Sequence, residues 1–529
     1  MSLDSNASTA GLSIATPQSI NLDAETTAVK ILGGAIAPAD LVCTTTVEKL
    51  SIACQGMSQL DPHEQEAQDL LLEFKENMTE QFPFVVVDPY ITSQSLHQER
   101  PLLWKAIIIA ASHGNSYRQM VLGADLMEDL TKRLLLRAEV SLDLLQALLV
   151  FIAWYHYHTL VNPQITNLLH LTKALINNMG LNRTQTTYDR GKFFLDGHES
   201  FKPRTQSSHG LESSSCRGLE PQFNTSYILE CCHKLEEAGE YQSDVVLAQL
   251  VRLQEIWYRM SRSFPYDESL ASRRPDAPVE MFVRAWQKEL ETFWASLPVE
   301  SQQNSKPPVQ SIRSASINCM STQELLLATY HTTQIALYEI DFPMCLPRVG
   351  FQVFDRTGRL EFIYASLLAT RKVFGVYSSI LVGRLSGICF TLWAQFNYAL
   401  LNAVKLLTTE ADGWDLQHAR NVLTFPDILH SQVTSIEETI SRRGLVLENA
   451  MYGKDVFIRF LRKVHHALRW YESSRVSRIE YEGMDDKPTD PNGSLETTDT
   501  GESLPVFDDA FWQTLFDDNW MLVGDGTST

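Results

Sequence analysis

Apolar side chains recur every three or four positions along most of the chain, which is the spacing of an amphipathic helix. Leu122, Leu126, Leu130 and Leu134 form one such row, and charged side chains surround it. Sustained alternation with a period of two, the pattern of a half-buried strand, is scarce. The pattern therefore predicts an all-α protein.

Two of the predicted helices have clear start signals. Ser141 can cap a helix over about 142–158, with Asp143 in its first turn, where the helix dipole favours negative charge. Ser321 and Glu324 have the spacing of a capping box ahead of a helix over 325–340. Further helices are expected near residues 163–180, 244–261, 280–296, 358–376, 386–407, 427–442 and 454–474.

One long apolar run could be proposed as a membrane span. Leu385–Val404 carries no charged side chain, and its length approaches that of a bilayer-crossing helix. It nevertheless contains Ser386, Gln395, Asn397 and Asn402. We therefore interpret it as a buried core helix and expect no membrane contact.

The composition divides the chain into four segments. Residues 1–45 are rich in Ser, Thr and Ala and are expected to form a flexible N-terminal segment. Residues 46–480 should form one helical domain, interrupted at 184–224 by a Gly- and Ser-rich loop insertion. Residues 481–505 form a polar, acidic linker, and residues 506–529 follow it with a different pattern. We therefore expect disordered termini on either side of the helices.

The charge balance limits what the protein can bind. The formal net charge is −20, and duplex binding depends on neutralising phosphates with Lys and Arg, so this body is a poor nucleic-acid binder. The densest basic run alternates with apolar residues at helical spacing. We interpret it as the solvated face of a helix, with a weak nuclear-import patch as the alternative. It contains Arg459, Arg462, Lys463, Arg469, Arg475 and Arg478.

The sequence lacks the usual signatures of catalysis and of metal binding. It has no Gly-rich phosphate loop after a strand, no Gly-x-Ser-x-Gly and no His-Glu-x-x-His. Its eight cysteines include no Cys-x-x-Cys pair. His156 and His158 lie two apart on an expected helix and diverge, so we expect hydrogen-bonded histidines rather than metal ligands. We predict no enzyme and no cofactor, and keep a helical enzyme with an unrecognised site as an alternative.

The C-terminal segment combines aromatic groups with acidic ones. On a helix, Phe511 and Leu515, and likewise Trp512, Phe516 and Trp520, lie on one broad face. Four aspartates and no Lys or Arg accompany them, and this like charge keeps the aromatic rings solvated in the free chain. Such segments fold onto a partner's hydrophobic groove and are typical of activation domains. The alternative is a terminal helix docked on the protein's own body. The candidate partner-binding residues are Phe507, Phe511, Trp512, Leu515, Phe516, Trp520 and Leu522.

Several short stretches resemble a known family when they are taken in order. They begin with Phe82–Val86, Glu99–Pro101, Ser141–Gln146, Ala153–His158 and Met179–Asn182. Later matches are Tyr227, Glu230–Cys232, Leu235–Glu236 and Ser243–Asp244. In this order and spacing, the chain resembles the regulatory domain, or middle homology region, of fungal zinc-cluster (Zn2Cys6) transcription factors. The likeness covers about 75–182 and 225–265.

This resemblance implies a multi-helix regulatory domain, a nuclear location and control of a metabolic or secondary-metabolite gene set. Family members also carry six N-terminal cysteines that hold two zinc ions. Cys43 and Cys54 alone cannot build that cluster, so no zinc ligand is carried over and direct DNA binding is not expected. We predict a regulator, specifically an activator, that recruits transcription coactivators and pairs with itself or with a zinc-cluster protein.

Two alternatives stay open within the same family. One is a cofactor or inhibitor that pairs with a full-length zinc-cluster paralogue and uses its DNA contacts. The other is a DNA-binding activator whose zinc cluster is encoded just upstream of Met1. Residues 184–224 also depart from the family, which usually continues there with a charged and then apolar helix.

Overall fold

The computed structural model describes residues 62–155, 164–181, 225–241, 243–263, 279–298, 321–339, 356–378, 385–409, 411–443 and 455–482. These residues form α-helices with short 3-10 and π segments and contain no strand, so the all-α prediction is confirmed. They all belong to one compact unit, Gly56–Thr529. The segments expected at 1–45, 184–224 and 506–529 lie outside the described residues, as do His156 and His158.

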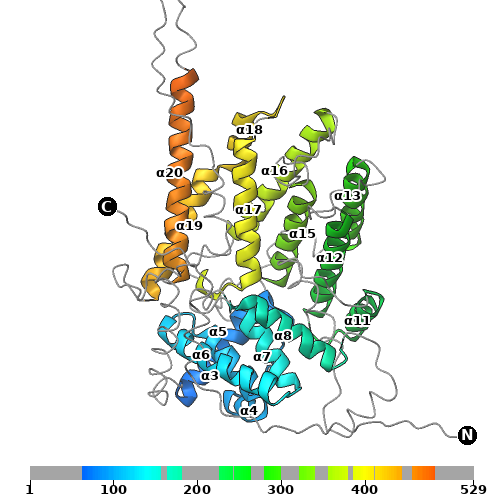
Figure 1. Cartoon of the computed structure of the whole chain (residues 1–529), viewed down its shortest axis with the longest axis vertical. Helices are drawn as coiled ribbons and strands as arrows, with labels where there is room; N and C mark the ends of the chain where they lie inside the picture. The colour runs from blue at the N-terminus through cyan, green and yellow to red at the C-terminus, as the bar shows by residue number, and fades with distance from the viewer. Residues whose placement is uncertain are drawn as a thin grey trace, which may run out of the picture. The chain divides into compact units, whose positions relative to one another are not determined.

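The first group of helices gathers around α5 and α7, which pack against each other (Figure 1). Nearly every side chain of these two helices is buried, because their sequences are apolar on all sides. The group consists of α3 (Glu64–Glu73), α4 (Ser93–Glu99), α5 (Pro101–Ala111), α6 (Ser116–Thr131), α7 (Leu142–Ala153) and α8 (Ile165–Asn178). Shorter segments follow α3 and α6, namely a π-helix at Phe74–Met78, a 3-10 helix at Thr79–Gln81 and a π-helix at Lys132–Leu136.

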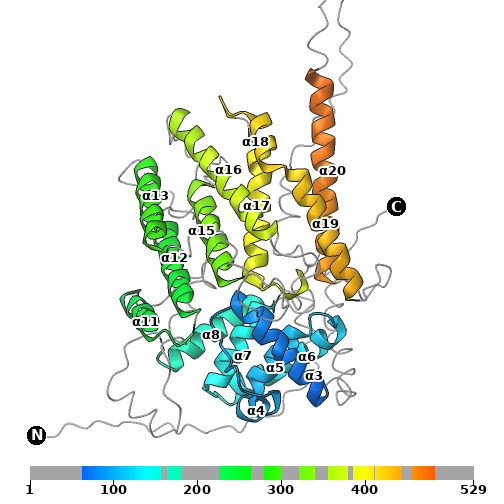
Figure 2. The same cartoon turned by 180° about the vertical axis from the view of Figure 1, so that it is seen from behind.

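The later helices are longer, and most of them lie side by side (Figure 2). Most pack against their neighbours in the chain, as α15 does against α16 and α19 against α20. Most of their positions agree with the helices expected from periodicity, whereas no helix was expected at 225–238 or 416–423. They are α11 (Thr225–Ala238), α12 (Asp244–Ser263), α13 (Val279–Ser296), α15 (Thr322–Tyr338), α16 (Arg356–Ser378), α17 (Phe390–Thr408), α18 (Leu416–Leu423), α19 (Phe425–Arg442) and α20 (Val456–Glu482).

Both predicted helix caps are present. The backbone N–H of Leu144 donates to the Ser141 hydroxyl over 3.3 Å at the start of α7. At the start of α15, the Ser321 hydroxyl accepts from the Glu324 N–H, and the Glu324 carboxylate accepts from the Ser321 N–H. These contacts satisfy backbone donors that the first turn of a helix leaves without partners.

Asp143 lies in the first turn of α7, as predicted, and has a further role as well. Its carboxylate accepts the backbone N–H groups of Leu103, over 2.8 Å, and Leu102, over 3.2 Å. Those groups belong to the first turn of α5, so Asp143 caps a neighbouring helix as well as lying in the first turn of α7. The described part of α7 ends at Ala153, before the expected limit of 158.

Most of the uncharged run at 385–404 lies in the core helix α17, as predicted, although residues 385–389 precede that helix and include a 3-10 turn. Gln395 on α17 donates to the Thr329 hydroxyl over 3.0 Å. Asn402 donates to the hydroxyls of Ser366, over 2.9 Å, and Thr370, over 2.7 Å. Its polar groups therefore face α15 and α16. Within the described ranges, no helix has the length and apolar character needed to span a bilayer.

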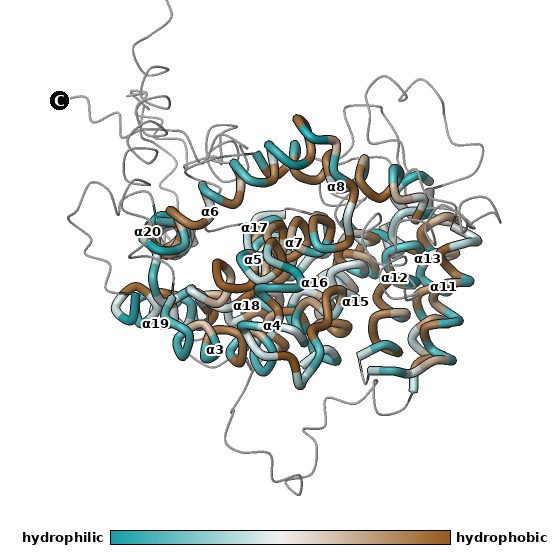
Figure 3. Tube along the Cα trace, turned by 90° about the horizontal axis from the view of Figure 1, so that it is seen from below, coloured by the Kyte–Doolittle hydropathy of each residue, from teal (hydrophilic) through white to brown (hydrophobic). Residues whose placement is uncertain are grey.

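Burial follows the amphipathic pattern closely. Leu122, Leu126 and Leu130 are buried, whereas Leu134 is only half-buried because α6 gives way to the π-helix at Lys132. Figure 3 shows α7 mostly hydrophobic, while outer helices such as α19 alternate between hydrophilic and hydrophobic positions. The basic run on α20 also lies on an amphipathic helix. Its apolar partners Phe457, Phe460, Leu461, Val464 and Leu468 are buried.

Candidate functional site at the helical junction

The structure does not test the site residues that the sequence predicted. Phe507, Phe511, Trp512, Leu515, Phe516, Trp520 and Leu522 all lie outside the described residues. Their role in binding a partner stays a prediction. Within the described helices, a network of buried polar contacts lies where α3–α8 meet the chain that leads into α17, and we call this region the junction.

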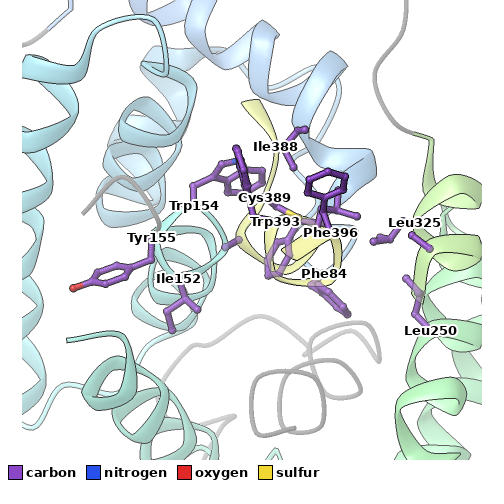
Figure 4. Packing of buried hydrophobic residues seen from close by; sticks show 14 of the residues in the cluster. Phe84, Ile152, Trp154, Tyr155, Leu250, Leu325, Ile388, Cys389, Trp393 and Phe396 are labelled. Atoms are coloured by element: carbon purple, nitrogen blue, oxygen red, sulfur yellow. The ribbon is translucent and has the colours of Figure 1, made fainter. Parts of the chain in front are cut away.

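The 385–389 segment, which begins with the 3-10 turn Leu385–Gly387, is bound to the first group of helices at several points. The Trp154 indole N–H donates to the Gly387 carbonyl over 3.1 Å. The Cys389 backbone N–H donates to Oε1 of Gln81 over 3.1 Å. Figure 4 shows Trp154 close to Cys389. Because all these groups are buried, each hydrogen bond replaces one that water would otherwise make.

His113 extends this network from the end of α5 to α3. Its Nδ1 lies 3.0 Å from the Ser386 hydroxyl, and its Nε2 lies 3.4 Å from Oε1 of Glu73. Ser386 is buried and belongs to the 385–389 segment. The imidazole therefore links a carboxylate on α3 to the chain entering α17.

Arg443 joins the end of α19 to the same region. It donates to the backbone carbonyl of His113 and to Oε1 of Gln119, over 3.4 Å for the latter. It also lies 3.4 Å from Oδ2 of Asp455 and 5.2 Å from the centre of the Phe457 ring. The Arg443 and Asp455 side chains are only 2% and 9% exposed. A buried cation with this many partners fixes the geometry, because removing one partner leaves charge without compensation.

The Asp455 carboxyl shows the energetic cost of this burial. Burial raises its pKa, while the Arg443 guanidinium and the backbone N–H groups of Phe457 and Ile458 oppose that rise. The raised pKa means that loss of water outweighs attraction to the neighbouring cation. The Arg443–Asp455 pair therefore fixes the relative positions of these residues more than it stabilises the fold.

An apolar pocket opens beside the 385–389 segment. Its volume, including the open mouth, is about 390 Å³. The Tyr377 hydroxyl donates to the Leu392 carbonyl and is not available to a ligand through its proton. The polar groups contributed by α19 are the Gln432 amide and the Ser435 hydroxyl. The pocket is lined by Tyr377, Leu385, Ile388, Trp393, Phe396, Gln432 and Ser435.

The lining is mostly apolar with few polar groups, and the enclosed part of the pocket has room for about one water molecule. Ligand sites are mostly apolar and carry few polar groups that fix orientation. The lining offers no pair of titratable groups for acid–base chemistry. Within the described ranges, no group of three or more His, Cys, Asp or Glu could hold a metal ion.

Sequence reasoning missed the junction residues because their partners are far apart in the chain. Trp154 and Gly387 are separated by 233 positions, and Arg443 and His113 by 330. Periodicity reports only local neighbours. The available signals were weak: Trp154 lies in a stretch that resembles the family, and Gly387 lies near the start of the uncharged run.

The chain is similar to three curated proteins that are named transcription factors. Transcription factor himD of Aspergillus japonicus is 25% identical over 446 residues, which is 80% of this chain and 69% of that protein. Transcription factor opdL of Penicillium oxalicum is 24% identical over 403 residues, 71% of this chain and 66% of that protein. A transcription factor of Aspergillus terreus is 22% identical over 475 residues, 87% of this chain and 70% of that protein.

The chain thus spans about two thirds of the length of these curated relatives. No family model matches it. No solved structure matches it either. The names of the relatives support a fungal transcription regulator.

Proposed function

We propose that this chain is a fungal transcription activator that acts in the nucleus on a metabolic or secondary-metabolite gene set. The observation that carries this proposal is the similarity to named transcription factors over 80%, 71% and 87% of the chain. A likeness of that extent involves most of the sequence rather than one short motif. The relatives are named transcription factors, so they give no support to the alternative of a helical enzyme.

Protein contacts are the proposed means of action. The net charge of −20 opposes approach to a phosphate backbone. We therefore assign DNA contact to a partner, either a zinc-cluster protein or a second copy that pairs with one. Residues 506–523 would bind coactivator through their aromatic side chains, and the aspartates would favour a groove with a basic rim.

The apolar pocket beside the 385–389 segment gives this regulator a place for a small effector. The pocket lies between α19 and the 385–389 segment, which is hydrogen-bonded to α7 and to the 3-10 helix after α3. A ligand that entered it would have to displace one of these elements, because the closed part holds about one water molecule. Binding and a shift at the junction would therefore be coupled.

A tethered-reporter assay tests the activation proposal. The full chain is fused to an unrelated DNA-binding domain, and reporter output is compared with that of the domain alone. We expect a gain that falls by about tenfold or more when Trp512, Phe516 and Trp520 are all changed to Ala. Aromatic anchors at the centre of an interface each contribute enough for such a loss.

The matched control changes three exposed apolar residues of the helical body to Ala, namely Tyr90, Leu229 and Met281. This control should leave the reporter gain unchanged. No gain from the full chain, or an equal loss in the control, would reject activation by residues 506–523. Immunoblotting would confirm equal amounts of each fusion.

A further inference from the structure

α6 and the turn after it carry apolar side chains on two faces. One face is formed by Leu122, Leu126 and Leu130, which are buried in the core. A second, mostly apolar row recurs at intervals of three or four positions, and none of its members is fully buried. We call this row the outer α6 stripe. It consists of Tyr117, Met120, Ala124, Met127, Thr131 and Leu135.

The outer α6 stripe is open to solvent at both ends. Tyr117 is 41% exposed and Leu135 is 61% exposed. Among the described elements, α6 packs mainly against α5, which covers its inner face. A surface helix normally carries polar side chains on its outer face, so an apolar row there marks an interaction surface. Met120 and Met127 add side chains that adapt to the shape of a partner.

The backbone holds the C-terminal end of the stripe in a defined shape. After the π-helix that follows α6, the Glu139 N–H donates to the Arg133 carbonyl over 2.9 Å. Ala138 has a φ of 50°, a left-handed conformation that residues other than glycine rarely adopt. Leu135 and the 79% exposed Leu136 are therefore presented by an ordered turn. Strained turns of this kind occur at functional positions.

Cations surround this end of the stripe, in a chain whose net charge is −20. Lys132 lies 2.6 Å from Glu128, and Arg133 lies 3.5 Å from Glu139. The third cation, Arg137, is exposed. Exposed ion pairs are weak and exchange readily, so the carboxylates of a partner can compete for all three cations.

The remaining acidic groups of α6 are already matched within the chain. Lys105 on α5 forms ion pairs with Asp125 and with Asp129, over 2.7 Å for the latter. A second copy of α6 would be a poor occupant of the stripe. Antiparallel pairing would bring Arg118 of one copy to the cationic end of the other, and parallel pairing would oppose Lys132 to itself. Like charges placed together across an interface disfavour association.

We propose that the outer α6 stripe docks an acidic amphipathic helix of a partner protein. The apolar row of that helix would pack along the stripe, and its carboxylates would face Lys132, Arg133 and Arg137. From Tyr117 to Leu135 the stripe measures about 27 Å at a rise of 1.5 Å per residue, which a helix of about 18 residues covers. This inference goes beyond the proposed activation function and uses none of residues 506–523.

A binding titration with a synthetic peptide tests the proposal on the full chain. The probe is a fluorescein-labelled peptide of about 20 residues, with leucine at every third or fourth position and glutamate beside the leucines. The control peptide has the same composition, with its leucines spread around all sides of the helix. We expect micromolar binding of the probe and at least about tenfold weaker binding of the control, because the stripe needs one continuous apolar face. Equal affinities would overturn the proposal.

Substitutions in the stripe identify the surface that binds the probe. Tyr117→Ser combined with Leu135→Ser should weaken binding by about tenfold, since both ends of the apolar row are lost. The matched control is Tyr364→Ser with Leu229→Ser, whose side chains are 41% and 36% exposed. Circular dichroism on heating should show that both double variants stay folded. An equal loss of affinity in the two would contradict docking along α6.

Charge reversal tests the role of the cations separately. Lys132→Glu combined with Arg137→Glu should weaken binding of the probe by about fivefold, the effect expected from two exposed ion pairs. Lys234→Glu with Arg284→Glu changes the net charge equally, at exposed positions that also have a glutamate four residues earlier. This control corrects for general repulsion of an acidic peptide. Equal affinities in both double variants would contradict the assigned charge contacts.

Photo-crosslinking gives a direct reading of the contact. A photoreactive phenylalanine analogue replaces Leu135 in the full chain, and we expect it to capture the probe peptide. The same analogue at Tyr90, which is 93% exposed and lies beside Asp88, should not capture it. Equal capture at both positions would overturn the proposal. So would crosslinks from position 135 that stay within the chain, or join two copies, when the probe is in excess.

These measurements are independent of the activation test. They read binding on the helical body without a reporter, so their failure leaves the activation proposal unaffected. A failed activation test likewise leaves the affinities and the crosslink unchanged.

Discussion

His331 on α15 shows how one buried side chain responds to its surroundings. It is 7% exposed, and its Nδ1 lies 2.8 Å from Oε1 of Gln334. The rings of Trp294 and Tyr330 lie next to it. Burial lowers its pKa to about 4, although the contact with Gln334 acts in the opposite direction. His331 is therefore neutral in the folded protein at neutral pH.

This shift predicts a pH dependence of stability. The unfolded chain binds a proton at His331 near pH 6.5, whereas the folded chain does so only near pH 4. The contribution of neutral His331 to the free energy of unfolding is therefore fully present above about pH 6.5. It is lost as the pH falls toward 4. Between pH 8 and pH 5, the unfolding free energy of the native chain should fall by about 2 kcal/mol relative to that of the His331→Phe variant. Denaturant unfolding of both proteins at the two pH values measures this. A difference that stays constant with pH would contradict the assignment.

Local residue signals were predictable from the sequence, and long-range partners were not. The caps at Ser141 and Ser321 were read correctly, because a cap contacts groups only two or three positions away. Asp143 was placed correctly in the first turn of α7. Its bonds to Leu102 and Leu103 were missed because they cross about 40 positions. Such contacts depend on how whole helices pack.

Among the elements, the 385–389 segment is held by specific hydrogen bonds to residues far away in the sequence. Its Gly387 carbonyl accepts from Trp154, and its Cys389 N–H donates to Gln81. The indole also packs edge-on against Phe74 and Phe82, with ring centres 5.6 and 5.9 Å away. Packing and hydrogen bonding at Trp154 can therefore be separated by substitution.

Trp154→Phe should retain most of the ring packing and remove the hydrogen bond to Gly387. We expect a loss of about 1–3 kcal/mol in unfolding free energy, because a buried carbonyl loses its donor. Hydrogen exchange should rise at residues 385–396 more than elsewhere. Unfolding curves and exchange mass spectrometry measure the two effects.

Two controls make this result specific. Trp104→Phe removes a comparable indole hydrogen bond, to Ser93 over 2.7 Å, at a site away from the 385–389 segment. Gly387→Ala should be tolerated, since a Cβ there would meet the His113 ring at an ordinary 3.8 Å. Equal exchange at 385–396 in the two tryptophan variants would contradict the role assigned to Trp154.

Periodicity predicted the long helices and missed several short ones. α12, α13, α15, α16, α17, α19 and α20 appear where apolar spacing indicated them, because each buries one face. α4 and α18 have only 7 and 8 residues, about two turns each, and the 14-residue α11 was missed as well. α20 continues to Glu482 beyond the expected end at 474, where the sequence is polar and offers no apolar row.

At the scale of the whole molecule, the junction connects helices that are far apart in sequence. Arg443 links the end of α19 to His113 after α5 and to Gln119 on α6. Asp455 brings the start of α20 to the same cation. A change at the pocket beside the 385–389 segment is therefore positioned to reach both groups of helices.

The candidate site was predictable only in part at this scale. Composition alone indicated the acidic-aromatic segment at 506–529, and that prediction stays untested by the described residues. The junction was missed because Gln81, Trp154, His113, Ser386 and Arg443 share no local motif. They come together only when the helices pack, and a single sequence does not encode that packing in a readable pattern.

Chromatin immunoprecipitation of the tagged full chain in a fungal host that expresses it tests the central claim most directly. Transcripts are measured in the same cells before and after the chain is depleted. We predict enrichment at a limited set of promoters, and a fall in the transcripts of those genes on depletion. An absence of promoter enrichment together with unchanged transcripts would contradict a role in transcription.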